Sequence, residues 1–152
     1  MNSLEHLKEL YLYNDWANRR IVFALRDAPS AKALQILAHI LITEKEYFER
    51  LYGKDSTGFD FWQALSREEC KELAQENAER YFSLLKNFDD EGLDISTSYK
   101  TSEGVSHRNT YREMLTHILF HSMSHRGQIN TILRQEGCSP ISNDYIIYLR
   151  NS

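Results

Sequence analysis

Apolar residues recur every three or four positions along two stretches in the first half of the chain, which is the spacing of an amphipathic helix. The first stretch covers about Ser3–Arg26 and the second about Ala31–Tyr52. Pro29 interrupts the pattern between them, and the Ser30 hydroxyl that follows is a suitable N-cap for the second helix. Gly53 is a natural end for that helix.

Two capping boxes predict the starts of two further helices. The box Ser66–Glu69 opens a third helix that continues to about Phe88, and the box Thr110–Glu113 opens a fourth that runs to Glu136. The segment Lys54–Phe61, between the second and third helices, is predicted to be a loop.

The least helical part of the chain lies between the third and fourth helices. Ile95–Lys100 and Val105–Arg108 flank the turn-forming sequence Ser102–Gly104, which predicts a short hairpin or an extended crossover. We therefore predict an all-α fold, a four-helix bundle with a long, partly extended connection between helices three and four. Long connections allow a bundle to depart from simple up-down-up-down order, and we expect that departure here.

Composition is that of one ordinary globular domain. The chain has 152 residues, 41% hydrophobic and 26% charged, so we expect a single domain spanning residues 1–152. A net charge of −4 with no basic patch argues against nucleic acid as a partner. The N-terminal stretch lacks the uncharged core of a signal peptide, and no segment is long and apolar enough to cross a membrane. We expect a cytoplasmic protein with no membrane partner, in which Cys70 and Cys138 are free thiols.

Three histidines stand four residues apart in the predicted fourth helix, at His117, His121 and His125. Two imidazoles at this spacing project from one helix face and can share a tetrahedral metal ion. The metalloprotease motif with the same spacing has a glutamate directly after its first histidine, and that general base is missing here. On a helical wheel, His125 falls within the apolar stripe and His121 at its edge, whereas His117 is turned out toward the flank. We therefore expect His121 and His125 to be the metal-binding pair.

Spacing alone leaves an alternative open, because an inward histidine can also be a hydrogen-bonded core residue. A third ligand has to come from another helix, and His39 is the other histidine in the middle of one. His39 lies well off the apolar stripe of its helix, which centres near Leu37, Leu41 and Phe48. Either this stripe faces a partner chain, or the helix is covered on more than one side.

Several segments of the chain resemble the DinB-like (DinB/YfiT) superfamily. They are Tyr13–Asn18, Leu37–His39 followed by Tyr47–Gly53, His121–Ile129, and the tail Pro140–Arg150. The resemblance therefore spans essentially the whole chain, and its most specific part is the HxxxHRGQ element with a further histidine upstream.

This resemblance implies a four-helix bundle, commonly a homodimer, that holds one divalent metal ion through three histidines. The ligands that it implies are His39, His121 and His125, and Zn²⁺ or Ni²⁺ is the expected ion. Within the motif we expect Arg126 to be structural or interfacial and Gly127 to permit a close helix contact.

Three imidazoles leave at least one coordination position open, as in catalytic rather than structural metal sites. Some members of the resembled family transfer low-molecular-weight thiols such as bacillithiol or mycothiol, so a thiol is a candidate co-substrate. We expect a metal-dependent enzyme, a thiol S-transferase or a hydrolase, acting on a small molecule. The alternative is a non-catalytic, stress-related binding or scaffolding dimer with a vestigial metal site, because no general base is visible beside the histidines. Glu46 and Tyr47, beyond His39 on the second helix, are candidates for the pocket wall.

Overall fold

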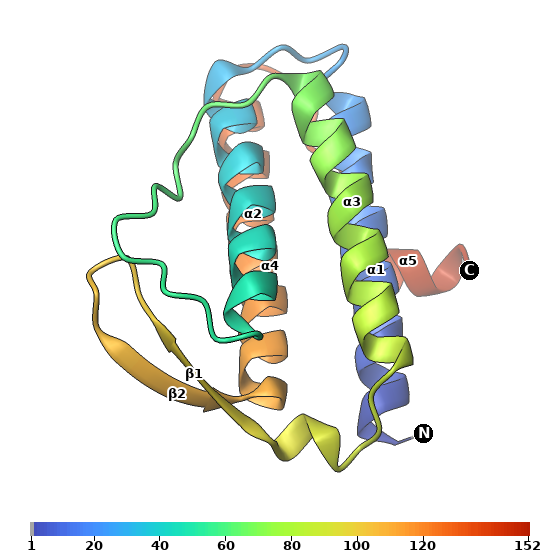
Figure 1. The fold of residues 1–152 in the computed structure, drawn as a ribbon. Coiled ribbons are helices and arrows are strands. Elements are labelled where there is room, and N and C mark those ends of the chain that lie inside the picture. Colours follow the sequence, from blue (N-terminus) through green and yellow to red (C-terminus); the bar gives the residue numbers. More distant parts are fainter. Residues whose placement is uncertain (1) are drawn as a thin grey trace.

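The computed structural model describes residues 2–152 and consists mainly of four long helices with a small hairpin (Figure 1). In chain order the elements are α1 (Ser3–Ala24), α2 (Ala31–Arg50), α3 (Arg67–Lys86), the 3₁₀ turn η1 (Gly92–Asp94), β1 (Ser96–Lys100), β2 (Ser106–Thr110), α4 (Tyr111–Gln135) and α5 (Tyr145–Arg150). The four predicted helices and the predicted hairpin are confirmed, and the short helix α5 is an addition to them.

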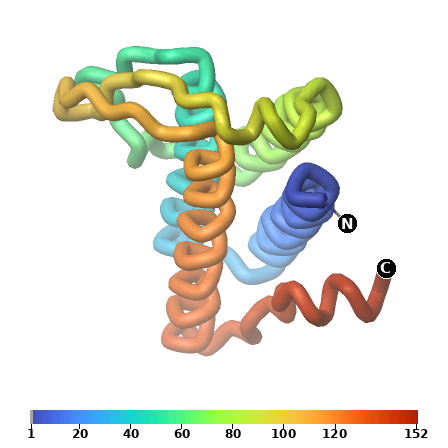
Figure 2. The backbone as a smooth tube through the Cα atoms, turned by 90° about the horizontal axis from the view of Figure 1, so that it is seen from below, coloured from blue at the N-terminus to red at the C-terminus, as the bar shows by residue number. Residues whose placement is uncertain are grey.

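The helices depart from up-down-up-down order, as expected. α1 and α2 run in opposite directions, but α3 runs in the same direction as α2, and α4 runs back (Figure 1). α1 packs mainly against α3, and α2 packs against both α4 and α3, so that α1 and α2 lie on one diagonal of the bundle and α3 and α4 on the other (Figure 2). The parallel run of α2 and α3 requires the chain to return along the length of the bundle, and the segment after α2 makes that return.

The caps of α3 and α4 show that similar sequence signals can have different outcomes. At α3 both halves of the capping box form, with Ser66 accepting from the Glu69 amide and Glu69 accepting from the Ser66 amide. At α4 only the first half forms, because the Glu113 carboxylate accepts a hydrogen bond from the Asn109 side chain instead. The second predicted box is therefore wrong in its reciprocal part, although Thr110 is the N-cap.

A second layer covers one side of the bundle. It consists of the hairpin β1–β2 and the segment between α2 and α3, which lie together beside α2 (Figure 1). The two parts are joined by backbone hydrogen bonds, including Ser56 N to Lys100 O at 3.0 Å and Gly58 N to Ser102 O at 2.9 Å. Gly53 makes the turn out of α2 with φ of 83°, and a Cβ there would come within 3.2 Å of the Ser98 carbonyl oxygen. The covering layer therefore depends on a residue without a side chain at this position.

The bundle interior has two apolar clusters with a buried polar layer between them along the helices. Glu44 of α2 accepts hydrogen bonds from Asn14 and Asn18 of α1, Asn77 of α3 and Ser122 of α4. Each of the four long helices therefore contributes a side chain to this layer.

Two residues of the predicted motif on α4 differ in outcome. Arg126 is buried and donates to the side-chain oxygens of Asn14 and Asn18, which makes it structural. Gly127 is exposed, and a Cβ at this position would meet nothing within 4 Å, so the predicted close helix contact is wrong within the chain.

Both cysteines are free, as expected, and Cys70 lies in the core, where burial raises the pKa of its thiol to about 12. No helix in residues 2–152 combines the length and the apolar character that crossing a membrane requires.

Candidate metal centre

α2 and α4 pack against each other and bring three histidines together. The ring centroids of His121 and His125, one turn apart on α4, are 4.5 Å from each other. The His39 ring, on α2, lies 5.0 Å from that of His121 and 4.7 Å from that of His125. Each of the three residues offers a ring nitrogen, and these nitrogen atoms all lie within 4.8 Å of one another. The structure thus brings together the three side chains that the resemblance implied.

The burial of His39 is explained by the covering layer. Only 6% of the residue is exposed, although it lies off the apolar stripe of α2. Trp62, from the segment after α2, stacks in parallel on the imidazole with a centroid distance of 3.7 Å. Of the two explanations that the sequence left open, covering of the helix on a second side by its own chain therefore accounts for His39.

Hydrogen bonds orient two of the three rings. His39 Nδ1 lies 2.8 Å from the Phe61 carbonyl oxygen. Because a carbonyl can only accept, this contact places the proton on Nδ1 and leaves the Nε2 lone pair free. His125 Nδ1 lies 2.6 Å from Gln128 Oε1, one turn further along α4, which favours the same tautomer. Contacts of this kind fix the orientation of metal-ligating histidines and raise their basicity.

His121 has a different environment. Its Nδ1 is buried and has no hydrogen-bond partner among the described residues. Burial, reinforced by the neighbouring imidazoles, lowers the pKa of His121 to about 3. Burial also lowers the pKa of His39, although the bond to Phe61 opposes this effect. Both rings are therefore neutral at pH 7, which is the state that binds a metal ion.

A divalent metal ion fits this group of residues. Three nitrogen ligands around one tetrahedral zinc ion lie roughly 3.4 Å apart, given Zn–N bonds of about 2.0–2.1 Å. Nitrogen atoms within 4.8 Å of one another reach that spacing by small side-chain rotations. The unpartnered nitrogen of His121 supports the fit, because buried polar atoms normally have a partner. The cluster could therefore hold a metal ion through three imidazoles.

His117 and Trp62 complete the surroundings of the cluster. His117 lies on the exposed flank of α4, 5.9 Å from the His121 ring, and is not part of the three-histidine group, in agreement with the helical wheel. Trp62 is a residue of the site that the sequence interpretation missed. The signal that could have indicated it is the aromatic sequence Phe59–Trp62, which is unusual in a segment with no helical or strand pattern.

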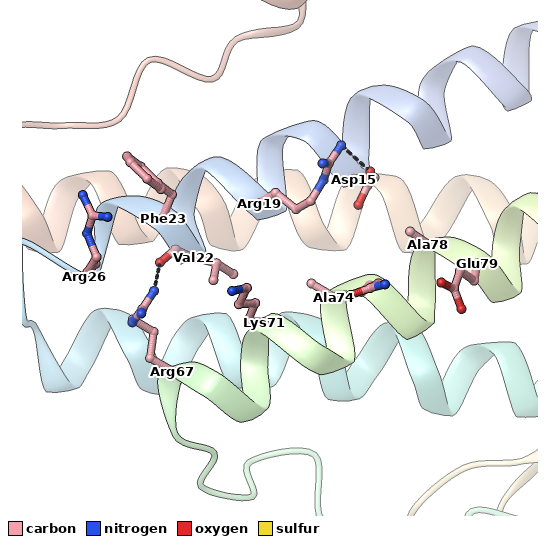
Figure 3. A pocket seen from close by; sticks show the side chains of 11 residues that line it. Asp15, Arg19, Val22, Phe23, Arg26, Arg67, Lys71, Ala74, Ala78 and Glu79 are labelled. Carbon is pink, nitrogen blue, oxygen red and sulfur yellow. Dashed lines mark hydrogen bonds and ion pairs between the residues drawn. The ribbon is translucent and has the colours of Figure 1, made fainter.

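The groove of about 710 Å³ between α1 and α3 lies away from the histidines (Figure 3). Several of its basic side chains already have partners in the protein. Arg19 forms an ion pair with Asp15 at 2.8 Å, and Arg67 donates to the Val22 carbonyl. Among the described residues, none of the buried side-chain atoms without a hydrogen-bond partner lines this groove, in contrast to the histidine cluster.

The fold and the site together define a class, a helical-bundle protein with a three-histidine cluster that could hold a metal ion. The chain belongs to the DinB family, whose sequence profile matches residues 1–152. It is similar to Protein DinB of Bacillus subtilis (strain 168), with 28% identity over 93% of this chain and 92% of the relative. It is also similar to the uncharacterised protein YizA of the same organism, with 26% identity over 74% of this chain and 70% of that protein. No solved structure matches the chain significantly.

Proposed function

We propose that this protein is a metal-dependent enzyme, a thiol S-transferase or a hydrolase, in which His39, His121 and His125 hold one Zn²⁺ or Ni²⁺ ion. The observation that carries this proposal is the convergence of three imidazole nitrogens without a fourth His, Cys, Asp or Glu ligand in the group. Within residues 2–152, no other three His, Cys, Asp or Glu side chains lie close enough together to hold a metal ion. Three protein ligands with a position left for a small molecule are typical of catalytic zinc sites.

A bound divalent ion would supply the chemistry by lowering the pKa of a water molecule or a thiol, so that it reacts as an anion at neutral pH. Besides holding the ion, the residues of this chain would have two tasks. The Phe61 carbonyl and Gln128 hold the rings of His39 and His125 in place, and Trp62 covers His39 on its outer side. In a thiol transfer, the sulfur forms a bond to an electrophilic carbon, the leaving group departs with the bonding pair, and the thiol proton passes to solvent.

A direct test compares turnover before and after removal of the metal. The protein loaded with Zn²⁺ or Ni²⁺ is assayed with a low-molecular-weight thiol and an aryl halide, and separately with activated esters. The proposal predicts turnover that a chelator abolishes and added metal restores. Turnover should also be lost in His121→Ala but retained in His6→Ala, which changes an exposed histidine near the start of α1. Equal rates in metal-free and metal-loaded protein would contradict the proposal.

The second candidate function is a non-catalytic binding or scaffolding module with a vestigial metal site. It is favoured by the absence of a carboxylate from the three-histidine group, since no general base stands beside the rings. Metal-dependent turnover that His121→Ala removes would exclude this alternative.

A further inference from the structure

The face of α2 that carries His39 continues as a buried polar stripe. Thr43, Glu46 and Arg50 lie within about 40° of His39 on a helical wheel, at 100° per residue. The exposed fractions of Thr43, Glu46 and Arg50 are only 3%, 1% and 4%. Charged side chains are rarely buried to this extent unless they are paired, so two of them on one helix face need an explanation.

Part of the explanation is that the stripe anchors the covering segment. Glu46 Oε1 pairs with Lys54 Nζ at 2.5 Å, and Arg50 Nε donates to Ser56 Oγ at 3.0 Å. These contacts hold the segment after α2 against the helix. They use only one oxygen of Glu46 and one of the three nitrogens of Arg50.

Other polar atoms of the stripe have no hydrogen-bond partner. Four buried side-chain atoms in residues 2–152 have no hydrogen-bond partner, and three of them are Thr43 Oγ1, Glu46 Oε2 and His121 Nδ1. Two of these belong to the stripe, and the third to the histidine cluster at its end. Such atoms are costly to bury, because each has lost its contact with water without gaining another. Three of the four lie in one region, and a polar ligand there would give them a partner.

Arg50 provides the strongest indication of what that ligand is. Among the described residues, no carboxylate lies within ion-pair distance of it, and its two terminal amino groups take part in no hydrogen bond. Its guanidinium lies over the rings of Tyr47, Phe61 and Tyr99, at 4.7, 5.2 and 5.4 Å from their centroids. The rings fix the plane of the guanidinium, and its free edge has the donor geometry that a carboxylate accepts in a two-point contact.

The stripe lies next to the histidines. Phe61, which contacts the Arg50 guanidinium through its ring, accepts the hydrogen bond of His39 through its carbonyl. On the other side, the Tyr47 ring lies 5.1 Å from that of His117, which in turn neighbours His121. A small molecule bound to Arg50 would therefore lie within a few side chains of the candidate metal centre.

We propose that Thr43, Glu46 and Arg50 bind a small amino- or hydroxy-carboxylate that forms part of the substrate. Its carboxylate pairs with the free amino groups of Arg50. Its ammonium or hydroxyl group donates to Glu46 Oε2, one helical turn away, with the Thr43 hydroxyl as an additional partner. This inference rests on the proposed function only in placing the ligand beside a reacting centre.

The test follows the side-chain Nε–H signal of Arg50 by NMR in the full-length ¹⁵N-labelled protein, before and after addition of one equivalent of Zn²⁺. The probes are glycine, glycolate and acetate. We expect saturable shifts of the Arg50 signal with glycine or glycolate, and binding of acetate weaker by about tenfold. Tighter binding of glycine identifies an ammonium as the donor, and tighter binding of glycolate a hydroxyl group; either result supports the site.

Three variants make the result specific. Arg50→Lys should weaken binding of every probe by about tenfold or more, because an ammonium cannot make the two-point contact. Glu46→Gln should weaken binding of the donor-carrying probe more than that of acetate. Arg134→Gln, which removes an exposed arginine of α4, should leave all three affinities unchanged. Each variant is checked by thermal unfolding, and Glu46→Gln serves as the test if Arg50→Lys does not fold.

The absence of saturable binding, or equal binding by the wild type and both stripe variants, would overturn the inference and assign these residues to anchoring alone. Because the metal-free protein is included, this failure can be distinguished from a failure of the proposed function. If the protein binds metal through its histidines but binds none of the probes, the inferred substrate site is contradicted and the proposed function is not. If the protein binds the probes but no metal, the proposed function is contradicted and the substrate site is supported.

Discussion

At the scale of single residues, the helix pattern predicted the two candidate ligands on α4 but not the candidate ligand on α2. Spacing and the helical wheel identified His121 and His125, because both positions depend on one helix alone. His39 lies off the apolar stripe of α2, and its burial comes from Phe61 and Trp62, which follow it by 22 and 23 residues in the chain. A residue buried by a distant irregular segment carries no local signal, so only the family resemblance indicated His39.

The stacking of Trp62 on His39 predicts a fluorescence signal for metal binding. Coordination of the imidazole changes the surroundings of the indole that lies 3.7 Å from it, centroid to centroid. Titration with Ni²⁺ or Zn²⁺ should therefore change the tryptophan emission until about one equivalent has been added. The change is measured as emission intensity against added metal.

The chain offers a matched control for this measurement, because it contains two tryptophans. Trp16 packs among Tyr13 and Tyr148 instead of the histidines. Trp62→Phe should abolish the metal-dependent change, whereas Trp16→Phe should retain it. A signal that survives in Trp62→Phe would show that the metal binds elsewhere.

At the scale of the helices, the capping signals and apolar periodicity predicted the ends of the four long helices to within two residues, but not α5. The buried polar layer could not be predicted in this way. Three different helices each contribute one polar residue to this layer, namely Asn14, Glu44 and Asn77. In the sequence, each of these residues alone is compatible with an exposed position. Their common role becomes apparent only when the helices are assembled and Glu44 is seen to accept from its neighbours on three sides.

This layer predicts a large loss of stability for Glu44→Ala. Removal of the carboxylate leaves the buried Arg126 guanidinium without a nearby negative charge and the amide groups of Asn14 and Asn18 without their acceptor. We expect the free energy of unfolding to fall by on the order of 3–5 kcal/mol. The measurement is urea denaturation followed by circular dichroism.

A control for the loss of a carboxylate as such is Glu79→Ala, which changes an exposed residue of α3. Its free energy of unfolding should stay within about 0.5 kcal/mol of the wild type. If Glu44→Ala and Glu79→Ala had equal effects, the polar layer would not contribute to stability as described.

At the scale of the whole molecule, the sequence was sufficient for the four helices and the hairpin, but not for their arrangement. The segment after α2 was predicted only as a loop, yet it returns along the bundle, pairs with β1 and covers the candidate site. Its backbone contacts with Lys100 and Ser102 join residues more than forty positions apart, which periodicity cannot indicate. The expected departure from simple helix order was therefore correct, although its cause lies after α2 rather than after α3.

The family resemblance also predicts a homodimer. In solution we expect a particle of twice the chain mass of 17.9 kDa. Size-exclusion chromatography with light scattering measures this mass directly. A monomer at every accessible protein concentration would show that the homodimer prediction is wrong, without affecting the candidate metal centre.

We propose that His39, His121 and His125 hold one divalent metal ion, and the metal content of the purified protein tests this most directly. The protein is purified without an affinity tag, dialysed, and analysed by elemental mass spectrometry alongside single alanine variants. We predict about one equivalent of metal per chain in the wild type and in His117→Ala, and a loss of at least tenfold in occupancy or affinity in His39→Ala, His121→Ala and His125→Ala. A wild type without metal that also fails to take up Zn²⁺ or Ni²⁺, or unchanged binding in these three variants, would contradict the claim.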